Sequence, residues 1–87
     1  MAWRIEVAKD FQKALKKLDR PTVKRVISKL REIEKLDDPR LMGKALVGNL
    51  AGLWRYRVGD YRIICSFEDE TLVVLVLDVA HRSKSYR

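Results

Sequence analysis

The sequence has very few of the cysteine and histidine residues that many enzymes and secreted proteins use for catalysis, metal binding or disulfides. Its 87 residues include one cysteine and one histidine, so we expect no disulfide framework, no zinc site and no other cofactor. Cys65 lies in an apolar segment, which is typical of a small buried side chain rather than of a nucleophile. No apolar run is long enough to span a membrane, and the N-terminus lacks the apolar core of a signal peptide. The sequence therefore predicts a cytoplasmic protein with no membrane contact.

Acidic residues are also scarce relative to basic ones. The chain has 12 Asp and Glu residues against 19 Lys and Arg residues, giving a net charge of +7. This excess favours a negatively charged partner, such as nucleic acid, an acidic protein or an anionic surface. With 47% hydrophobic residues, the chain is expected to fold as one globular domain over residues 1–87.

Hydrophobic periodicity in the first half predicts a strand and two helices. Residues 3–7 alternate between apolar and charged side chains, as a strand does. Helical spacing of apolar residues begins near Lys9, breaks at residues 19–21, and resumes as far as about Leu36. The two helices should form a hairpin with one apolar side. Residues 40–52 are rich in glycine and predict a loop with at most one short strand.

The second half predicts antiparallel strands. A hairpin follows the loop, then a turn at residues 68–70, and then an apolar strand over residues 72–77 that should be buried on both faces. The expected fold is α+β, in the order β-α-α-β-β-β. The helical hairpin should pack on one face of a small, mostly antiparallel twisted sheet.

The hairpin brings like charges together. Gly59-Asp60 is a two-residue turn signal, and such a turn pairs Arg57 with Arg62. Strand alternation places Arg55 on the same face as Arg57. Directly opposed like charges are destabilising, so a fold has no structural reason for this arrangement unless a polyanion binds there. The alternative is that the arginines extend into solvent from a polar sheet face.

The C-terminal segment adds further candidates to this face. If the apolar strand lies beside the hairpin, then His81, Arg82 and Tyr86 should reach the edge of the arginine face. The predicted group has no acidic residue and no set of metal ligands. It supplies cations for a phosphate, an imidazole that titrates near neutral pH, and an aromatic ring that can stack on a base.

This set of side chains suits one reaction in particular. RNA contains its own nucleophile, the 2′-hydroxyl, and its cleavage needs a base, an acid and positive charge around the phosphorane. Metal-independent cleavage of a phosphodiester is therefore an RNA hypothesis, because DNA has no such hydroxyl.

Two segments carry a resemblance to a known family. Residues 54–64, WRYRVGDYRII, and residues 79–86, VAHRSKSY, resemble the RelE toxins of the RelE/ParE superfamily, and the similarity extends over nearly the whole chain. The resemblance implies a RelE-like fold and the toxin of a type II toxin–antitoxin system. It implies an endoribonuclease that enters the ribosomal A site, cuts the mRNA codon there by 2′-hydroxyl attack, and so inhibits translation.

The resemblance also implies roles for individual residues. Arg62 would stabilise the phosphate in the transition state, Arg82 would assist the leaving oxygen or hold the phosphate, and Tyr86 would stack on or orient a base. Arg55 and Arg57 stand where some members carry lysines, and Arg57 is a poor general base because arginine is effectively never deprotonated. His81 could take the acid or base role. The expected RNA-binding residues are Arg55, Lys84 and Arg87.

The same resemblance implies binding partners and leaves alternative functions open. We expect an antitoxin with an acidic or amphipathic segment that covers the basic surface in a hetero-oligomer, in addition to the ribosome and mRNA. A ParE-like inhibitor of DNA gyrase would share the fold without needing an RNA-cleaving site. A non-catalytic RNA- or ribosome-binding module, or a degenerate toxin that only pairs with its antitoxin, would carry the same arginines without chemistry.

Overall fold

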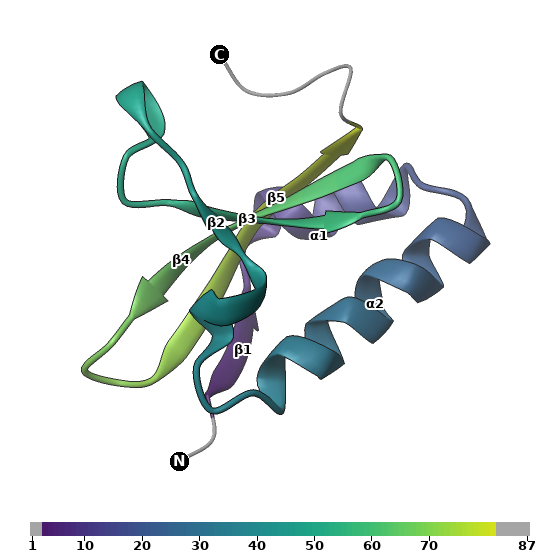
Figure 1. Ribbon diagram of the computed structural model, residues 1–87. Coiled ribbons are helices and arrows are strands. Elements are labelled where there is room, and N and C mark those ends of the chain that lie inside the picture. Colours follow the sequence, from purple (N-terminus) through teal and green to yellow (C-terminus); the bar gives the residue numbers. More distant parts are fainter. Residues whose placement is uncertain (1–2, 82–87) are drawn as a thin grey trace.

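The computed structural model describes residues 3–81 and consists of two helices on one face of a five-stranded mixed sheet (Figure 1). The sheet order is β1-β5-β4-β3-β2. β1 pairs with β5 in parallel, and the remaining pairs are antiparallel. In order along the chain, the elements are β1 (Arg4–Val7), α1 (Lys9–Lys16), α2 (Arg20–Glu34), the short 3₁₀ helix η1 (Pro39–Met42), β2 (Lys44–Ala45), the 3₁₀ helix η2 (Gly48–Leu50), β3 (Trp54–Val58), β4 (Tyr61–Glu68) and β5 (Val73–His81).

The predicted α+β order is confirmed, with differences in detail. The loop at 40–52 contains the expected short strand, β2, and also two 3₁₀ helices that the glycine pattern did not predict. α2 ends at Glu34, slightly before the expected end near Leu36, and begins after Asp19 with Pro21 in its first turn. β5 runs to His81, beyond the predicted end at Leu77, and lies between β1 and β4.

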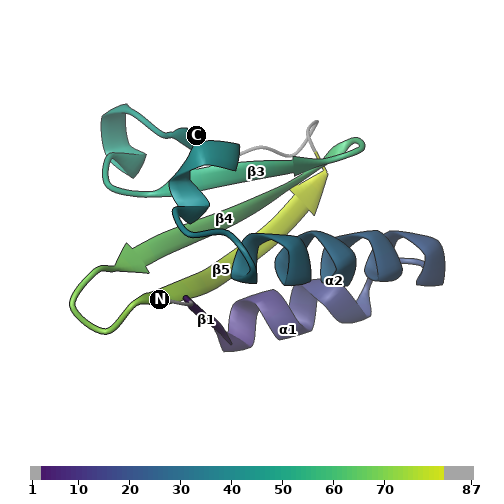
Figure 2. The ribbon, with the colours of Figure 1, turned by 60° about the horizontal axis from the view of Figure 1, so that its bottom comes forward.

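The core lies between the helices and one face of the sheet (Figure 2). Phe11 of α1 is 1% exposed, and Val26 and Ile33 of α2 are fully buried. These side chains pack against alternate residues of β3, β4 and β5, including Tyr56 and Ile63. The helices thus cover one sheet face, and the other face carries polar and charged side chains together with a few apolar ones. No helix within residues 3–81 has the length and apolar character of a membrane span.

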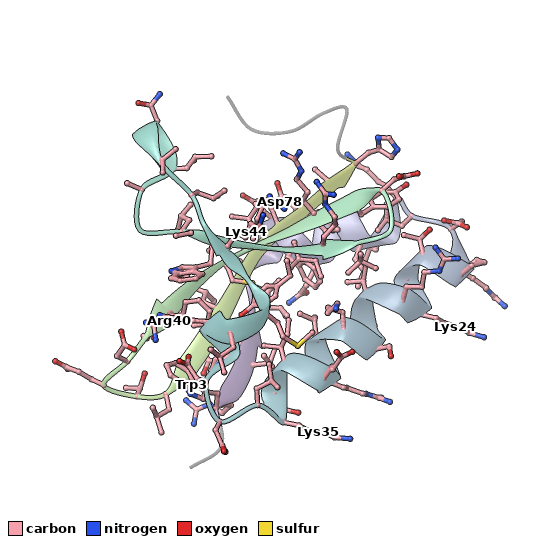
Figure 3. The ribbon with its side chains drawn as sticks, in the orientation of Figure 1. Trp3, Lys24, Lys35, Arg40, Lys44 and Asp78 are labelled. Atoms are coloured by element: carbon pink, nitrogen blue, oxygen red, sulfur yellow. The ribbon has the colours of Figure 1, made fainter. Side chains whose placement is uncertain are left out.

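Arg40, in η1 after α2, binds to the turn between β4 and β5. Its guanidinium binds both carboxylate oxygens of Asp69, at 2.7 and 2.8 Å, and its Cζ lies 4.5 Å from the ring centroid of Phe67. The same guanidinium lies near the ring of Trp3 (Figure 3). It also lies near the ring of Trp54. An arginine held by a carboxylate and stacked on aromatic rings combines an ion pair with a cation–π contact.

We expect the substitution Arg40→Ala to lower the free energy of unfolding by about 1–2 kcal/mol, because it removes both interactions and the packing of the side-chain stem. Urea denaturation measures this change. Arg4→Ala is the control, since Arg4 pairs with Glu6 at 3.0 Å but its side chain is 68% exposed. An exposed pair of this kind contributes about 0–1 kcal/mol. Equal effects of the two substitutions would contradict the role given to Arg40.

Candidate anion-binding site

The hairpin between β3 and β4 has the predicted register. Val58 pairs with Tyr61, and Arg57 pairs with Arg62. Gly59, at the first turn position, has a φ of 57°, which is the left-handed conformation that a tight hairpin turn of this type requires. The direct opposition of two guanidinium-bearing residues is therefore confirmed.

The arginines lie on the sheet face away from the helices. Their strand neighbours Tyr56 and Ile63 are 1% and 0% exposed and belong to the core. Because successive side chains of a strand point to opposite faces, Arg55, Arg57 and Arg62 share the other face. This surface is called the arginine face below. It carries three cations on two adjacent strands.

Lys44 extends the arginine face by one strand. It pairs directly with Arg55 across β2 and β3, so its side chain joins the same face (Figure 3). The sequence reasoning missed Lys44 because a two-residue strand within a glycine-rich loop has no hydrophobic pattern from which its register can be predicted. The arginine face thus carries a second pair of directly opposed cations, Lys44 and Arg55.

Arg62 is the one member of this cluster with a buried donor that lacks a partner. Its Nε atom is buried and has no hydrogen-bond partner among the described residues. A buried unpaired N–H is unfavourable by about 1–3 kcal/mol, and by more for a charged group. A phosphate lying against the opposed pair would also relieve the repulsion between Arg57 and Arg62. The pairing therefore suits a phosphate held at Arg62 and flanked by Arg57.

The arginine face also contains a carboxylate, and this corrects the expectation that it has no acidic residue. Asp78 of β5 pairs with Ile64, which lies on the arginine face between Arg55 and Asp78. One Asp78 oxygen, Oδ1, accepts a hydrogen bond of 2.8 Å from the backbone N–H of Val79. The prediction failed because β5 continues well past Leu77, so Asp78 lies within the strand rather than after it.

His81 does not join the arginines, and the prediction of its position is wrong. In β5, Ala80 pairs with Arg62, whereas His81 pairs with Tyr61 on the helix side. The rings of His81 and Tyr61 make an edge-to-face contact with centroids 5.2 Å apart. Both line a cleft of about 530 Å³ against α1, together with Lys13, Lys17 and part of Asp78. The physical reason is a β-bulge after Val76, because one extra residue in a strand moves every later side chain to the opposite face.

The remaining predicted site residues fall in the C-terminal segment. Arg82, Lys84, Tyr86 and Arg87 lie outside the described residues, so their roles stay predictions. Over residues 3–81 there is no cluster of three or more histidine, cysteine or acidic side chains that could hold a metal ion.

The buried titratable side chains are structural. Burial raises the pKa of the Cys65 thiol to about 12, so the thiol is neutral at physiological pH, and the prediction that this cysteine is buried is confirmed. Burial also raises the pKa of Tyr56, whose hydroxyl donates a hydrogen bond of 2.6 Å to the carbonyl oxygen of Pro39. Neither group has the exposure or the ionisation that a catalytic role requires.

The structure defines a class of small α+β proteins in which two helices back a sheet with a basic outer face, and comparisons with known proteins identify the family. Residues 5–86 match the family model described as the ParE toxin of type II toxin–antitoxin systems. The chain is 35% identical over 80 residues to toxin RelE of Mycobacterium tuberculosis, covering 92% of this chain and 77% of that protein. The chain therefore belongs to the RelE/ParE superfamily, and it is a RelE-family toxin of a type II toxin–antitoxin system.

Solved structures show the same fold. The toxin–antitoxin complex RelBE2 from Mycobacterium tuberculosis matches with a TM-score of 0.74 and 28% identity, covering 97% of this chain and 95% of that chain. The archaeal RelE–RelB complex from Pyrococcus horikoshii matches with a TM-score of 0.74 and 28% identity, covering 98% and 100%. A mutant of Escherichia coli toxin RelE in the free state has a TM-score of 0.79 at 24% identity, covering 98% and 88%, and this similarity shows the fold alone.

Proposed function

We propose that this toxin is a ribosome-dependent mRNA endoribonuclease that cuts codons in the A site and thereby inhibits translation. The observation that carries the proposal is the opposed Arg57–Arg62 pair, in which Arg62 holds a buried N–H without a partner. Such a pair is unfavourable in the free protein and becomes favourable when a phosphate lies against it.

The chemistry assigned to the arginine face is attack by the ribose 2′-oxygen on the adjacent phosphorus. Arg62 and Arg57 would stabilise the negative charge that develops on the phosphorane, as donors already fixed in place do at other active sites. Arg55 and Lys44 would bind neighbouring phosphates along the mRNA backbone. Within the C-terminal segment, Arg82 and Tyr86 keep the roles implied by the resemblance, and Lys84 and Arg87 are proposed as RNA-binding residues.

We expect dependence on the ribosome because the described part of the arginine face offers no strong base. A ribosome would hold the mRNA so that the 2′-oxygen is aligned with the phosphorus, and this orientation lowers the barrier beyond what the side chains of the toxin achieve alone. The test compares naked mRNA with the same mRNA on programmed ribosomes. The proposal predicts cleavage only on the ribosome, whereas efficient cleavage of naked RNA would contradict the ribosome dependence.

His81 is left out of the proposed machinery because it lies on the helix side of the sheet. We expect His81→Gln to leave the cleavage rate within about threefold of the wild-type value, because loss of a general acid or base costs about 100-fold or more. Rates measured on programmed ribosomes decide this. A loss of 100-fold or more would return His81 to the mechanism.

The proposed protein partner is an antitoxin with an acidic or amphipathic segment. The solved relatives include toxin–antitoxin complexes of RelE with RelB, and the net charge of +7 favours an acidic partner. We expect the antitoxin to neutralise this toxin by covering the arginine face or by displacing the C-terminal segment. A complex that left both accessible and the toxin active would contradict this.

A ParE-like action on DNA gyrase is the second candidate, because the matched family model is described by the ParE toxin. Such an inhibitor would not need the buried donor of Arg62 to contact a phosphate. A supercoiling assay distinguishes the two. Inhibited gyrase together with intact mRNA in a translating extract would favour the ParE-like reading, and would make the arginine face a docking surface.

A further inference from the structure

Among residues 3–81, the arginine face has cations for a phosphate, but neither its arginines nor His81 can take a proton from the 2′-hydroxyl. Guanidinium groups stay protonated, and His81 lies on the other side of the sheet. We propose that Asp78 is this proton acceptor. The proposal deepens the function proposed above and rests on it.

The register of the sheet places Asp78 beside the phosphate-binding arginines. One row of cross-strand neighbours runs through Lys44, Arg55, Ile64 and Asp78, from β2 to β5. The adjacent row, two residues along each strand, contains Arg57, Arg62 and Ala80. Asp78 is therefore the diagonal neighbour of Arg62, about 7–8 Å away between backbone positions. A ribose and its phosphate can lie between two side chains at this separation.

A bulge in β5 is what turns Asp78 toward the arginines. Cys65 pairs with Val76, but the preceding residue, Ile64, pairs with Asp78, so Leu77 is left without a cross-strand partner. In a regular ladder Ile64 would pair with Leu77, and Asp78 would point into the helix-side core. Bulges interrupt the ladder and commonly redirect a side chain next to an active site. Here the bulge places a carboxylate among cations.

Local contacts hold the Asp78 carboxylate in place. Its Oδ1 atom accepts the N–H of Val79, whose side chain is 4% exposed and anchored in the core. This contact fixes the orientation of the carboxyl group relative to the strand, because its donor is the backbone N–H of the next residue. Ile64, which is 3% exposed, provides an apolar floor between Asp78 and Arg55.

Other described carboxylates on this sheet face are poorly placed. Glu6 lies on the edge strand β1 and pairs with Arg4 at 3.0 Å. Glu68 is the last residue of β4 and pairs with Val73, four residues along the strand from Ile64. With a rise of about 3.3 Å per residue, Glu68 is more than about 10 Å from the Ile64 row. Asp78 alone among these three is adjacent to Arg62.

The proposed step transfers one proton and exchanges one bond at phosphorus. Asp78 takes the proton of the 2′-hydroxyl as the 2′-oxygen forms its bond to phosphorus. The bond from phosphorus to the 5′-oxygen then breaks, and this oxygen takes a proton from water. The products are a 2′,3′-cyclic phosphate and a 5′-hydroxyl, and Asp78 finally releases its proton to solvent.

The variant Asp78→Asn tests the proposal, because the amide oxygen can still accept the Val79 N–H but cannot take a proton. We expect the single-turnover rate of cleavage on programmed ribosomes to fall by about 10²–10⁴-fold. The affinity for the ribosome and the melting temperature should stay near the wild-type values. Glu68→Gln is the matched control, since it removes a carboxylate from the same sheet face, and its rate should be unchanged.

A second variant and a modified mRNA allow the role of Asp78 to be tested even if Asp78→Asn does not fold. If Asp78→Asn does not fold, Asp78→Ser replaces it, because the hydroxyl can also accept the N–H of Val79. An mRNA with sulfur in place of the 5′-oxygen has a leaving group that needs no proton. Asp78→Asn should remain slow on this mRNA if Asp78 acts on the 2′-hydroxyl, whereas recovery to the wild-type rate would overturn that role.

The remaining outcomes separate this inference from the function on which it rests. Cleavage by Asp78→Asn within about threefold of wild type, with Arg62→Ala inactive, would overturn only the role of Asp78. An equal loss in Glu68→Gln would show a general charge effect and would also overturn that role. If the wild-type toxin leaves ribosome-bound mRNA intact, the proposed function and this inference both fail.

Discussion

Arg62→Ala should reduce the rate of mRNA cleavage on programmed ribosomes by at least about 10²–10³-fold, the loss that follows removal of one fixed donor to a transition-state oxyanion. The reason is specific to Arg62, because Arg62 is directly opposed to Arg57 on the arginine face, where the phosphate is proposed to lie. The fold should not suffer, since the substitution also removes the repulsion from Arg57 and an unsatisfied buried donor. A single-turnover assay measures the rate, and a thermal melt measures the stability.

Arg31→Ala is the matched control for Arg62→Ala. Arg31 is an exposed residue of α2, on the opposite side of the sheet from the arginine face, and its loss changes the net charge by the same amount. We expect its cleavage rate to stay within about threefold of wild type, because a distant charge contributes mainly to long-range attraction. Equal losses in the two variants would show that net charge alone matters, and would contradict a phosphate site at Arg62.

Arg57→Glu should stabilise the fold and inactivate the toxin. Replacing one member of a directly opposed like-charge pair by a carboxylate converts repulsion into attraction with Arg62, which is worth about 0.2–1 kcal/mol in a cross-strand pair. The same carboxylate repels the mRNA phosphate and occupies the guanidinium that should bind it, so cleavage should fall by more than about 100-fold. Urea denaturation and the single-turnover assay measure the two effects on one protein sample.

Arg57→Lys separates charge from geometry in this experiment. It keeps a cation opposite Arg62, so the stability should remain near that of wild type and part of the activity should survive. If Arg57→Glu were instead less stable than wild type, the arginines would be contributing to the fold rather than opposing it. A stable and fully active Arg57→Glu variant would remove Arg57 from the site.

Local signals in the sequence were sufficient to predict the centre of the site. The Gly59-Asp60 turn fixes the register of its two strands by its length, and the pairing of Arg57 with Arg62 follows from that register alone. The helices were predictable for a similar reason, because their apolar stripes repeat within a few residues. In both cases the interacting residues are close in sequence.

The members of the site that were missed or misplaced depend on pairing between distant segments. Lys44 joins the arginine face only because β2 pairs with β3, and two residues carry no periodicity. Asp78 and His81 are placed by the length and the bulge of β5, and a bulge of one residue reverses the face of every later side chain. The sequence predicted an apolar strand that ended too early, so His81 was placed on the wrong face and Asp78 was not predicted to lie on the arginine face.

The most direct test of the account uses an mRNA whose A-site codon carries a 2′-deoxy nucleotide on the 5′ side of the scissile phosphate. Wild-type toxin is added to ribosomes programmed with this mRNA or with its all-ribose equivalent, and the 5′ ends are mapped by primer extension. We expect cleavage of the all-ribose mRNA at a fixed position in the codon and no cleavage of the deoxy-substituted mRNA, because the nucleophile is missing. Equal cleavage of both would contradict attack by the 2′-hydroxyl.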